Sequence, residues 1–269
     1  MPIANLNGIQ LSYEVSGDGP LVVLVMGTGS PGSVWRSYQV PALVKAGFRV
    51  ATMDNRGIAP TDGGLGGMRF EDLVGDTAAL IQHLGGPAHV VGTSMGARVV
   101  QELALARPEL VRKAVMMATV GRPHPLAQLL NRGEQAMITE KVTLPTEYAA
   151  SIKAMLNLSP HTLADPDQAQ QWLDIFEYSA GTKPSPGVLA QLAMDRSQNR
   201  LAEYARIRVP SLVVGFADDR MAPPMFGREV AEAIPGARYV EIEKCGHYGY
   251  LERPDEVNRV LVDFLTATE

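Results

Sequence analysis

A single cysteine, Cys245, is present among the 269 residues, so the chain cannot form an internal disulfide. The sequence has no CxxC pair, no HExxH motif and no His-rich tract, and we therefore expect no metal site. It also lacks the GxxxxGK[ST] loop of phosphate-binding proteins. Gly27-Thr28-Gly29 follows an expected strand, as the start of a dinucleotide-binding loop would. However, the third glycine of the dinucleotide-binding motif is missing where we expect the next helix to open, at Val34. We therefore expect no cofactor.

Long runs of one charge and long apolar runs are missing as well. The formal net charge is −5, which argues against nucleic acid and against an anionic membrane surface as the main partner. No apolar stretch approaches the ~20 residues that a membrane-spanning helix needs. The first eight residues lack the basic and apolar regions of a signal peptide, so we expect a cytoplasmic protein. The oligomeric state is not predicted.

The sequence does contain a regular alternation of apolar strands and amphipathic helices. A hydrophobic content of 46% and a charged content of 20% are ordinary for a soluble globular enzyme. We expect strands at residues 3–6, 9–15, 21–26, 48–53, 88–91, 111–118, 210–215 and 237–242. We expect helices at residues 34–46, 70–84, 97–106, 224–233 and 254–266. This alternation predicts an α/β fold with a doubly wound, mostly parallel sheet.

The alternation stops between residues 121 and 207. This stretch is helical in pattern and is punctuated by prolines at 145, 160, 166, 184 and 186. We therefore expect an α/β core formed by residues 1–120 and 208–269, with residues 121–207 inserted as a helical cap. Some of its apolar side chains are expected to line a substrate pocket, and the others to pack the cap on the core. The candidates are Met137, Met155, Trp172, Phe176, Tyr178 and Met194.

Gly92-Thr93-Ser94-Met95-Gly96 is the stretch around which the chain is organised. It joins an expected strand to an expected helix, and two glycines flank Ser94, where a Cβ would crowd the strand and the helix. This arrangement is typical of a nucleophile elbow, which holds a serine in strained backbone above the end of a sheet. Ser94 is therefore the candidate nucleophile.

A serine hydroxyl needs a general base, and the base needs an acid that orients it. On this scaffold we expect the order Ser, acid, His along the chain. His83 and His89 precede Ser94, and His124 and His161 lie in the expected cap, so His247 is the candidate base. Glycines on both sides let its loop turn toward Ser94.

Asp218 and Asp219 both follow the expected strand 210–215 and compete for the role of the acid. We choose Asp219, which stands four residues before Pro223, and Asp218 is the alternative. A tetrahedral intermediate also needs two hydrogen-bond donors for its oxyanion. The backbone N–H groups of Met95 and Thr28 are the candidates, with Gly29 as the alternative to Thr28.

Cys245 stands two residues before His247, but the elbow already supplies a nucleophile. We therefore expect Cys245 to be a small packed residue.

These motifs together resemble proteins of the α/β-hydrolase fold. The shared stretches are Met26-Gly27-Thr28-Gly29, Asp54-Asn55-Arg56-Gly57, the Ser94 elbow, Asp219 to Pro223 and Cys245-Gly246-His247, and they occur in the family's order. The resemblance covers essentially the whole chain and implies a triad of Ser94, Asp219 and His247 with Met95 and Thr28 as oxyanion donors. One departure is that Met26 stands where the family commonly has a histidine. The family's dehalogenases and epoxide hydrolases use an aspartate nucleophile, so Ser94 argues against both.

The expected activity is hydrolysis of a small or medium apolar ester, lactone or thioester through an acyl-enzyme on Ser94. Two alternatives use the same fold. One is a lyase, cyclase or cofactor-free perhydrolase that works with the same triad. The other is a receptor that binds its ligand without turning it over, because a fold alone does not establish chemistry. In each case the expected partner is a small molecule.

Overall fold

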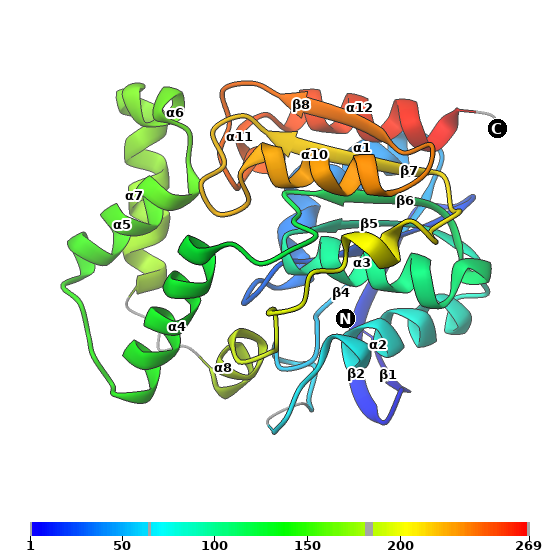
Figure 1. The fold of residues 1–269 in the computed structure, drawn as a ribbon, viewed down its shortest axis with the longest axis horizontal. Coiled ribbons are helices and arrows are strands. Elements are labelled where there is room, and N and C mark those ends of the chain that lie inside the picture. Colours follow the sequence, from blue (N-terminus) through cyan, green and yellow to red (C-terminus); the bar gives the residue numbers. More distant parts are fainter. Residues whose placement is uncertain (1, 64–65, 181–184, 268–269) are drawn as a thin grey trace.

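The computed structural model describes residues 2–63, 66–180 and 185–267 (Figure 1). Residues 1 and 268–269 of the expected core, residues 64–65 of the same core and residues 181–184 of the expected cap, Pro184 among them, lie outside the described residues.

The described residues form an eight-stranded sheet in the order β1-β2-β4-β3-β5-β6-β7-β8. Every pairing from β4 to β8 is parallel, whereas β2 pairs antiparallel with both β1 and β4. The predicted mostly parallel sheet is therefore confirmed. The strands are β1 (Ile3–Leu6), β2 (Ile9–Ser16), β3 (Leu21–Val25), β4 (Arg49–Met53), β5 (Ala88–Thr93), β6 (Val111–Met117), β7 (Ser211–Phe216) and β8 (Arg238–Ile242).

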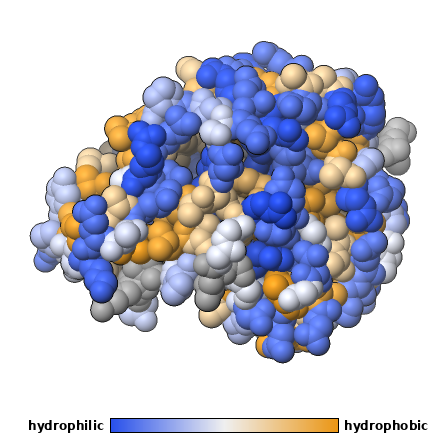
Figure 2. All heavy atoms as spheres, turned by 60° about the horizontal axis from the view of Figure 1, so that its bottom comes forward, coloured by the Kyte–Doolittle hydropathy of each residue, from blue (hydrophilic) through white to orange (hydrophobic). Residues whose placement is uncertain are grey.

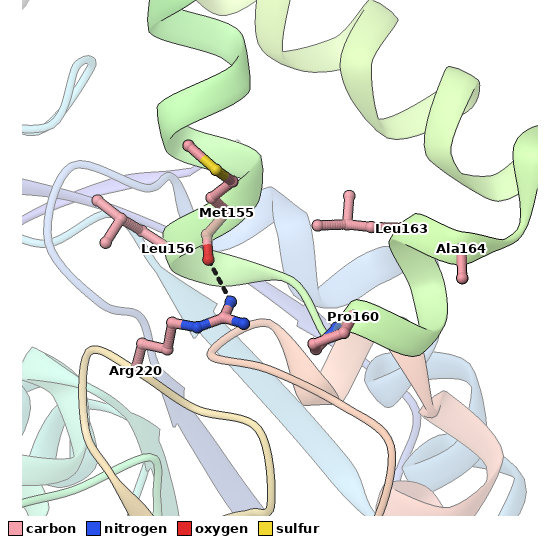
Figure 3. A pocket seen from close by; sticks show the side chains of 6 residues that line it. All are labelled: Met155, Leu156, Pro160, Leu163, Ala164 and Arg220. Atoms are coloured by element: carbon pink, nitrogen blue, oxygen red, sulfur yellow. Dashed lines mark hydrogen bonds between the residues drawn. The ribbon is translucent and has the colours of Figure 1, made fainter.

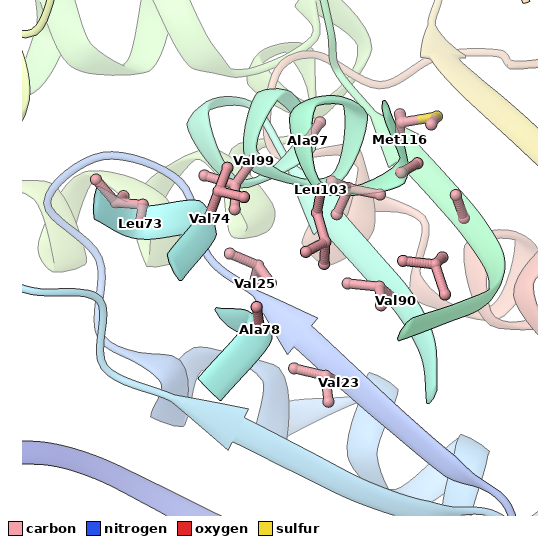
Figure 4. Close-up of a cluster of buried hydrophobic side chains, with 14 of the residues drawn as sticks. Val23, Val25, Leu73, Val74, Ala78, Val90, Ala97, Val99, Leu103 and Met116 are labelled. Atoms are coloured by element: carbon pink, nitrogen blue, oxygen red, sulfur yellow. The ribbon is translucent and has the colours of Figure 1, made fainter. Parts of the chain in front are cut away.

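Helices cover both faces of the sheet, as in a doubly wound fold. Side chains alternate along each strand, so Val22 and Leu24 of β3 pack on one face and Val23 and Val25 on the other. The first face is covered by α1 (Gln39–Lys45), α11 (Gly249–Glu252) and α12 (Pro254–Thr266). The second is covered by α2 (Phe70–His83), α3 (Met95–Ala106) and α10 (Pro224–Ala233). Figure 4 shows side chains of α2 and α3 meeting Val23, Val25 and Val90 of the sheet.

The segment before α1 differs from the continuous helix expected at residues 34–46. A 3-10 helix, η1 (Gly32–Ser37), is followed by a break at Tyr38, where φ is −141° and ψ is −47°, and then by α1. Pro41 explains the break, because a proline clashes with the carbonyl four residues before it and fits only in the first turn of an α-helix. Pro41 was the signal for a new helix start.

The stretch between β6 and β7 is helical, and prolines open most of its helices. Pro125, Pro160, Pro166 and Pro186 each occupy the first position of a helix, where a missing N–H costs nothing. The helices are α4 (Pro125–Thr139), α5 (Thr146–Asn157), α6 (Pro160–Ala164), α7 (Pro166–Ala180), α8 (Pro186–Leu192) and α9 (Leu201–Tyr204). Figure 1 shows α4, α5, α6 and α7 on the side toward which the arrowheads of β6, β7 and β8 point. The division into core and cap at residues 120/121 and 207/208 stays a prediction.

A small core of its own holds α5 against α7. Ala150, Ala154 and Leu158 pack against Phe176, and Trp172 and Tyr248 border the cluster. Figure 2 shows hydrophobic side chains on the surface on the side where these helices lie. The exposed ones in this stretch include Leu126, Leu129, Val142, Tyr148, Met155, Ile175 and Tyr178. None of the helices in the described part of the chain has the length and apolar character to cross a membrane.

Candidate active site

Ser94 occupies a strained turn between the end of β5 and the start of α3. Its φ of 54° and ψ of −118° lie where side chains with a Cβ are rarely found. The two flanking glycines make this turn compatible with its surroundings. A Cβ on Gly92 would lie 2.3 Å from the carbonyl oxygen of Gly96, and one on Gly96 would lie 2.2 Å from that of Val25. The Ser94 side chain is therefore raised above the carboxyl end of the sheet on a helix N-terminus.

Asp219 and His247 are brought together by the loops that follow β7 and β8. Asp219 Oδ2 lies 2.8 Å from Nδ1 of His247, and the Asp219 side chain is buried. Its other oxygen, Oδ1, accepts hydrogen bonds of 2.8 Å from the backbone N–H groups of Met221 and Ala222. Three donors thus fix the carboxylate, and the carboxylate in turn fixes the ring. With Nδ1 facing the acid, Nε2 of the ring is the atom left for proton transfer.

Asp218, the alternative acid, is engaged elsewhere. Its Oδ2 accepts a 2.5 Å hydrogen bond from the hydroxyl of Ser159, which precedes α6. Of the two neighbouring carboxylates, one therefore contacts the histidine and the other contacts the segment between β6 and β7.

The loop that carries His247 is held by close backbone packing and by one buried carboxylate. A Cβ on Gly246 would lie 2.6 Å from the carbonyl oxygen of Asn157, so the loop approaches α5 as only glycine allows. Glu252 Oε2 accepts a 2.6 Å hydrogen bond from the N–H of Gly246. Its Oε1 accepts from the N–H of Ser159 and from the hydroxyl of Thr162. Glu252 thus ties the histidine loop to α6.

The structure does not join Ser94 and His247 by a hydrogen bond among the described residues, although both follow strands at the carboxyl edge of the sheet. Bonds between a nucleophile and its base are commonly long without substrate and tighten in the complex. The role of the three residues as a triad stays a prediction.

The loop after β3 lies directly beside Ser94. A Cβ on Gly27 would be 3.9 Å from the Ser94 hydroxyl oxygen. The N–H of Gly29 donates to Oε1 of Gln191 at 2.8 Å, so this alternative donor is already used. The N–H groups of Thr28 and Met95 have no partner among the described residues. These two therefore remain the candidates for binding an oxyanion.

Gly27, Gly29 and Gly32 do have GxGxxG spacing, which the sequence-based expectation overlooked by placing the next helix at Val34. The structure places a 3-10 helix, not an α-helix, after this loop. The N–H of Gly32 donates to Asp54 Oδ1 at 2.8 Å. A dinucleotide fingerprint directs such N–H groups at a pyrophosphate from an α-helix N-terminus. Gly27 instead packs against Ser94, Gly29 against Val188 of α8, and Gly32 against Met53 of β4.

The remaining histidines contact the protein interior or solvent. His124 is the N-cap of α4, stacks on Phe226 with ring centroids 4.8 Å apart, and has Nε2 3.2 Å from the carbonyl oxygen of Met221. Burial lowers the pKa of His89 to about 4, with Lys113 and Arg112 adding to the effect. His83 contacts the Tyr13 hydroxyl, and His161 is exposed.

Cys245 is fully buried beside the carbonyl oxygen of Ile242, and its burial raises the pKa of the thiol. A buried thiol with a raised pKa is a poor nucleophile.

Two apolar hollows lie among the helices of the inserted stretch. The larger, about 560 Å³, is lined by Met155, Leu156, Pro160, Leu163, Ala164 and Arg220. Figure 3 shows the Arg220 guanidinium directed at the carbonyl oxygen of Met155 between α5 and α6. The smaller, about 200 Å³, lies between α4 and α5, and Met137 and Leu156 line it. Met137 and Met155 thus line hollows, whereas Phe176 and Met194 are packed inside and Tyr178 is exposed.

Two polar side chains that contact the loop carrying Thr28 were not predicted from the sequence. Gln191 of α8 bridges two loops, because it accepts from Gly29 and donates from Nε2 to the carbonyl oxygen of Arg56 at 3.0 Å. Arg196 Nη2 lies 3.4 Å from the hydroxyl oxygen of Thr28. Both reach the loop from more than 160 positions away in sequence, and no local pattern marks them. No group of three or more potential metal ligands occurs in the part of the chain that the structure describes.

Comparison with known proteins gives one consistent result. A model of the alpha/beta hydrolase family matches residues 22–260. The chain is 42% identical to "Putative non-heme bromoperoxidase BpoC" of Mycobacterium tuberculosis, over 97% of this chain and 99% of that protein. The crystal structure of that protein has a TM-score of 0.90 and covers 95% of each chain.

Two more distant relatives carry hydrolase names. An enol-lactonase from Burkholderia xenovorans LB400 is 28% identical, with a TM-score of 0.84 over 99% of this chain and 100% of that one. A 2-hydroxy-6-oxononadienedioate/2-hydroxy-6-oxononatrienedioate hydrolase of Dechloromonas aromatica is 27% identical over 96% of this chain and 91% of its own length.

Proposed function

The chain belongs to the alpha/beta hydrolase family, and we propose that it cleaves a small or medium, largely apolar ester, lactone or thioester through an acyl-enzyme on Ser94. It is an enzyme of the hydrolase type. The observation that carries the assignment of residues is the 2.8 Å contact between Asp219 and His247 at the sheet edge where Ser94 stands. In this proposal Ser94 is the nucleophile, His247 the general base and Asp219 the acid that orients it.

Acylation begins when Nε2 of His247 takes the proton of the Ser94 hydroxyl as its oxygen attacks the substrate carbonyl. Asp219 keeps the other ring proton on Nδ1 and stabilises the imidazolium that forms. The carbonyl oxygen becomes an oxyanion, which the N–H groups of Met95 and Thr28 bind. Each such donor is worth roughly 10²–10³ in kcat. The tetrahedral intermediate collapses as His247 gives its proton to the leaving alcohol or thiol.

Deacylation repeats these steps with water as the nucleophile. His247 takes a proton from water, the hydroxide adds to the acyl carbon, and the same two N–H groups bind the second oxyanion. Collapse of this intermediate returns the proton to Ser94 and releases the carboxylic acid.

A fluorophosphonate probe with intact-mass detection tests this proposal. We expect one covalent adduct on the native enzyme, located on Ser94, and none on Ser94→Ala. Ser159→Ala is a matched control, because that hydroxyl is engaged by Asp218, and it should label like the native enzyme. No adduct, or an equal adduct on Ser94→Ala, would overturn the proposal.

The name of the Mycobacterium tuberculosis relative favours one alternative, in which hydrogen peroxide replaces water in the second half-reaction. The acyl-enzyme would then release a peracid, and the peracid would oxidise bromide. Product analysis with acetate, peroxide and bromide separates this perhydrolase from a hydrolase. A receptor that only binds its ligand would show no turnover of that ligand. Ser94→Ala would then leave its affinity for the ligand unchanged, which distinguishes a receptor from an enzyme.

A further inference from the structure

Two cationic side chains from the stretch between β6 and β7 act on the same carboxylate without forming an ion pair with it. Glu134 lies on α4, Lys153 on α5, and Arg196 follows α8, and all three are half-buried. Each cation interacts electrostatically with Glu134. Within residues 2–63, 66–180 and 185–267, however, no carboxylate lies within 4.0 Å of the Lys153 or Arg196 nitrogens.

Burial acts on the ionisation of each member of this cluster. It lowers the pKa of Arg196 to about 10 and also lowers that of Lys153. It raises the pKa of Glu134, and the two cations partly oppose this. With all three groups ionised, two positive charges face one negative charge, and Arg98, which also acts on Arg196, is itself paired with Glu102. A partly desolvated site with one uncompensated positive charge favours binding of one anion.

Hydrogen bonds hold Arg196 in place at the Thr28 loop. Its Nη1 donates to the carbonyl oxygen of Leu192 and its Nη2 to that of Gln191, both at 3.1 Å. The same Nη2 lies 3.4 Å from the Thr28 hydroxyl oxygen, and the guanidinium lies 5.8 Å from the centroid of the Phe70 ring. Because these contacts fix the planar group, little conformational entropy remains to be lost when it pairs with a carboxylate.

We propose that the substrate carries a carboxylate in addition to its scissile acyl group, and that Arg196 binds this carboxylate beside Thr28. This inference rests on the proposed function and names the class of substrate for the same site. Lys153 adds to the attraction, and Glu134 limits it.

The charge balance favours a carboxylate over a phosphate monoester. A carboxylate brings one negative charge, which matches the excess of one positive charge in the cluster. A phosphate monoester carries about −1.5 to −2 at pH 7 and would leave the site negative next to Glu134. A neutral substituent would leave the Arg196 charge unpaired.

Two matched series of methyl esters test the proposal. One series contains the monomethyl esters of succinic, glutaric and adipic acid, and the other contains the corresponding esters with a terminal carboxamide. Methanol release gives kcat/KM for each, and the ratio of charged to neutral substrate is the readout. Phosphonate analogues of the same lengths test the alternative anion as competitors.

For the native enzyme we expect the ratio to exceed ten for at least one chain length. Arg196→Gln should lower that ratio roughly 10- to 100-fold, because it removes a charged hydrogen-bond donor. Arg196→Lys should keep part of the preference. Glu134→Gln should raise the ratio, since it removes the only negative charge of the cluster. Arg206→Gln, at an exposed arginine, should leave it unchanged.

A purely structural Arg196 would lower kcat/KM equally for both series, and that result would overturn the inference. Equal turnover of the two series, or turnover of neither, would overturn it as well, and stronger competition by phosphonates than by carboxylates would reassign the anion. Labelling of Ser94 by the neutral fluorophosphonate is measured on the same samples. It decides the proposed function separately, because this probe needs no carboxylate subsite.

Discussion

Asp219 contacts His247 through Oδ2 and Nδ1, 2.8 Å apart, while its other oxygen accepts two backbone hydrogen bonds. The neighbouring carboxylate of Asp218 contacts Ser159 instead. This division gives a matched pair of substitutions one position apart in the chain.

Asp219→Asn should lower kcat by roughly 10³- to 10⁴-fold, because an amide does not hold the productive tautomer of the ring. Asp218→Asn should stay within a few-fold of the native enzyme, because it alters only the contact with Ser159. Both are measured as kcat on the best ester of the panel and as the rate of Ser94 labelling. A loss in Asp218→Asn as large as that in Asp219→Asn would contradict the assignment.

The sheet and the elbow were predictable because their signals are local. Ser94 lies in a five-residue pattern between a strand and a helix, and the strands predicted around it are confirmed to within one or two residues at their ends. The break at Tyr38 was missed, although Pro41 marked it. Local sequence does not distinguish Asp218 from Asp219, because the hydroxyl that engages Asp218 comes from Ser159, 59 positions away.

The contacts of the inserted stretch with the Thr28 loop could not be predicted from the sequence. Gln191 and Arg196 look like ordinary polar residues of a helix end, and their partners Gly29 and Thr28 lie 162 and 168 positions away. Tertiary packing alone brings them together. The catalytic roles of Ser94, Asp219 and His247 are predictions that labelling and kinetics will decide.

Gln191→Met should weaken both folding and catalysis. The substitution conserves volume but leaves the N–H of Gly29 and the carbonyl of Arg56 without their partner, and each unpaired buried group costs about 1–3 kcal/mol. We expect a loss of about 2 kcal/mol or more in urea unfolding and a roughly tenfold fall in kcat, because the Thr28 loop is less well fixed. Gln170→Met is the control, since Gln170 is exposed and its side chain bonds Asp174 on its own helix. Native kcat in Gln191→Met would argue against this positioning role.

Alanine at two helical glycines should change stability in opposite directions. In Gly96→Ala the new Cβ would lie 2.2 Å from the Val25 carbonyl oxygen, so β3 or the elbow must shift, and we expect a loss of several kcal/mol. In Gly133→Ala, inside α4, the Cβ meets nothing within 4 Å, and the gain in helix propensity should stabilise by up to about 1 kcal/mol. Thermal unfolding measures both. A neutral Gly96→Ala would contradict the close approach at the elbow.

Stability should fall in mild acid because of His89. Burial lowers its pKa in the folded protein to about 4, below the 6.5 of an ordinary histidine, so the unfolded chain takes up the proton first. This contribution is fully present above pH 6.5 and is lost as the pH falls from 6.5 toward 4, by up to about 3 kcal/mol at 1.36 kcal/mol per pKa unit. His89→Leu should flatten the pH dependence of unfolding in this window. His161→Gln, at an exposed site, should leave the dependence unchanged.

The inserted helices are anchored in two separate groups. Glu252 ties α6 to the His247 loop, and α5 and α6 pack on α7. Gln191 ties α8 to the loops after β3 and β4, and α4 packs on α8 through Asn131 and Gln135, which donate to the Leu192 carbonyl oxygen. Among the residues that the structure describes, no hydrogen bond joins α4 to α5.

The two groups therefore meet along an apolar boundary between α4 and α5, which Glu134 lines from α4. Separating the two groups of helices between α4 and α5 would break van der Waals contacts but none of the hydrogen bonds that hold either group. The boundary between α4 and α5 is therefore the place where the two groups can shift relative to each other at the lowest cost in hydrogen bonds.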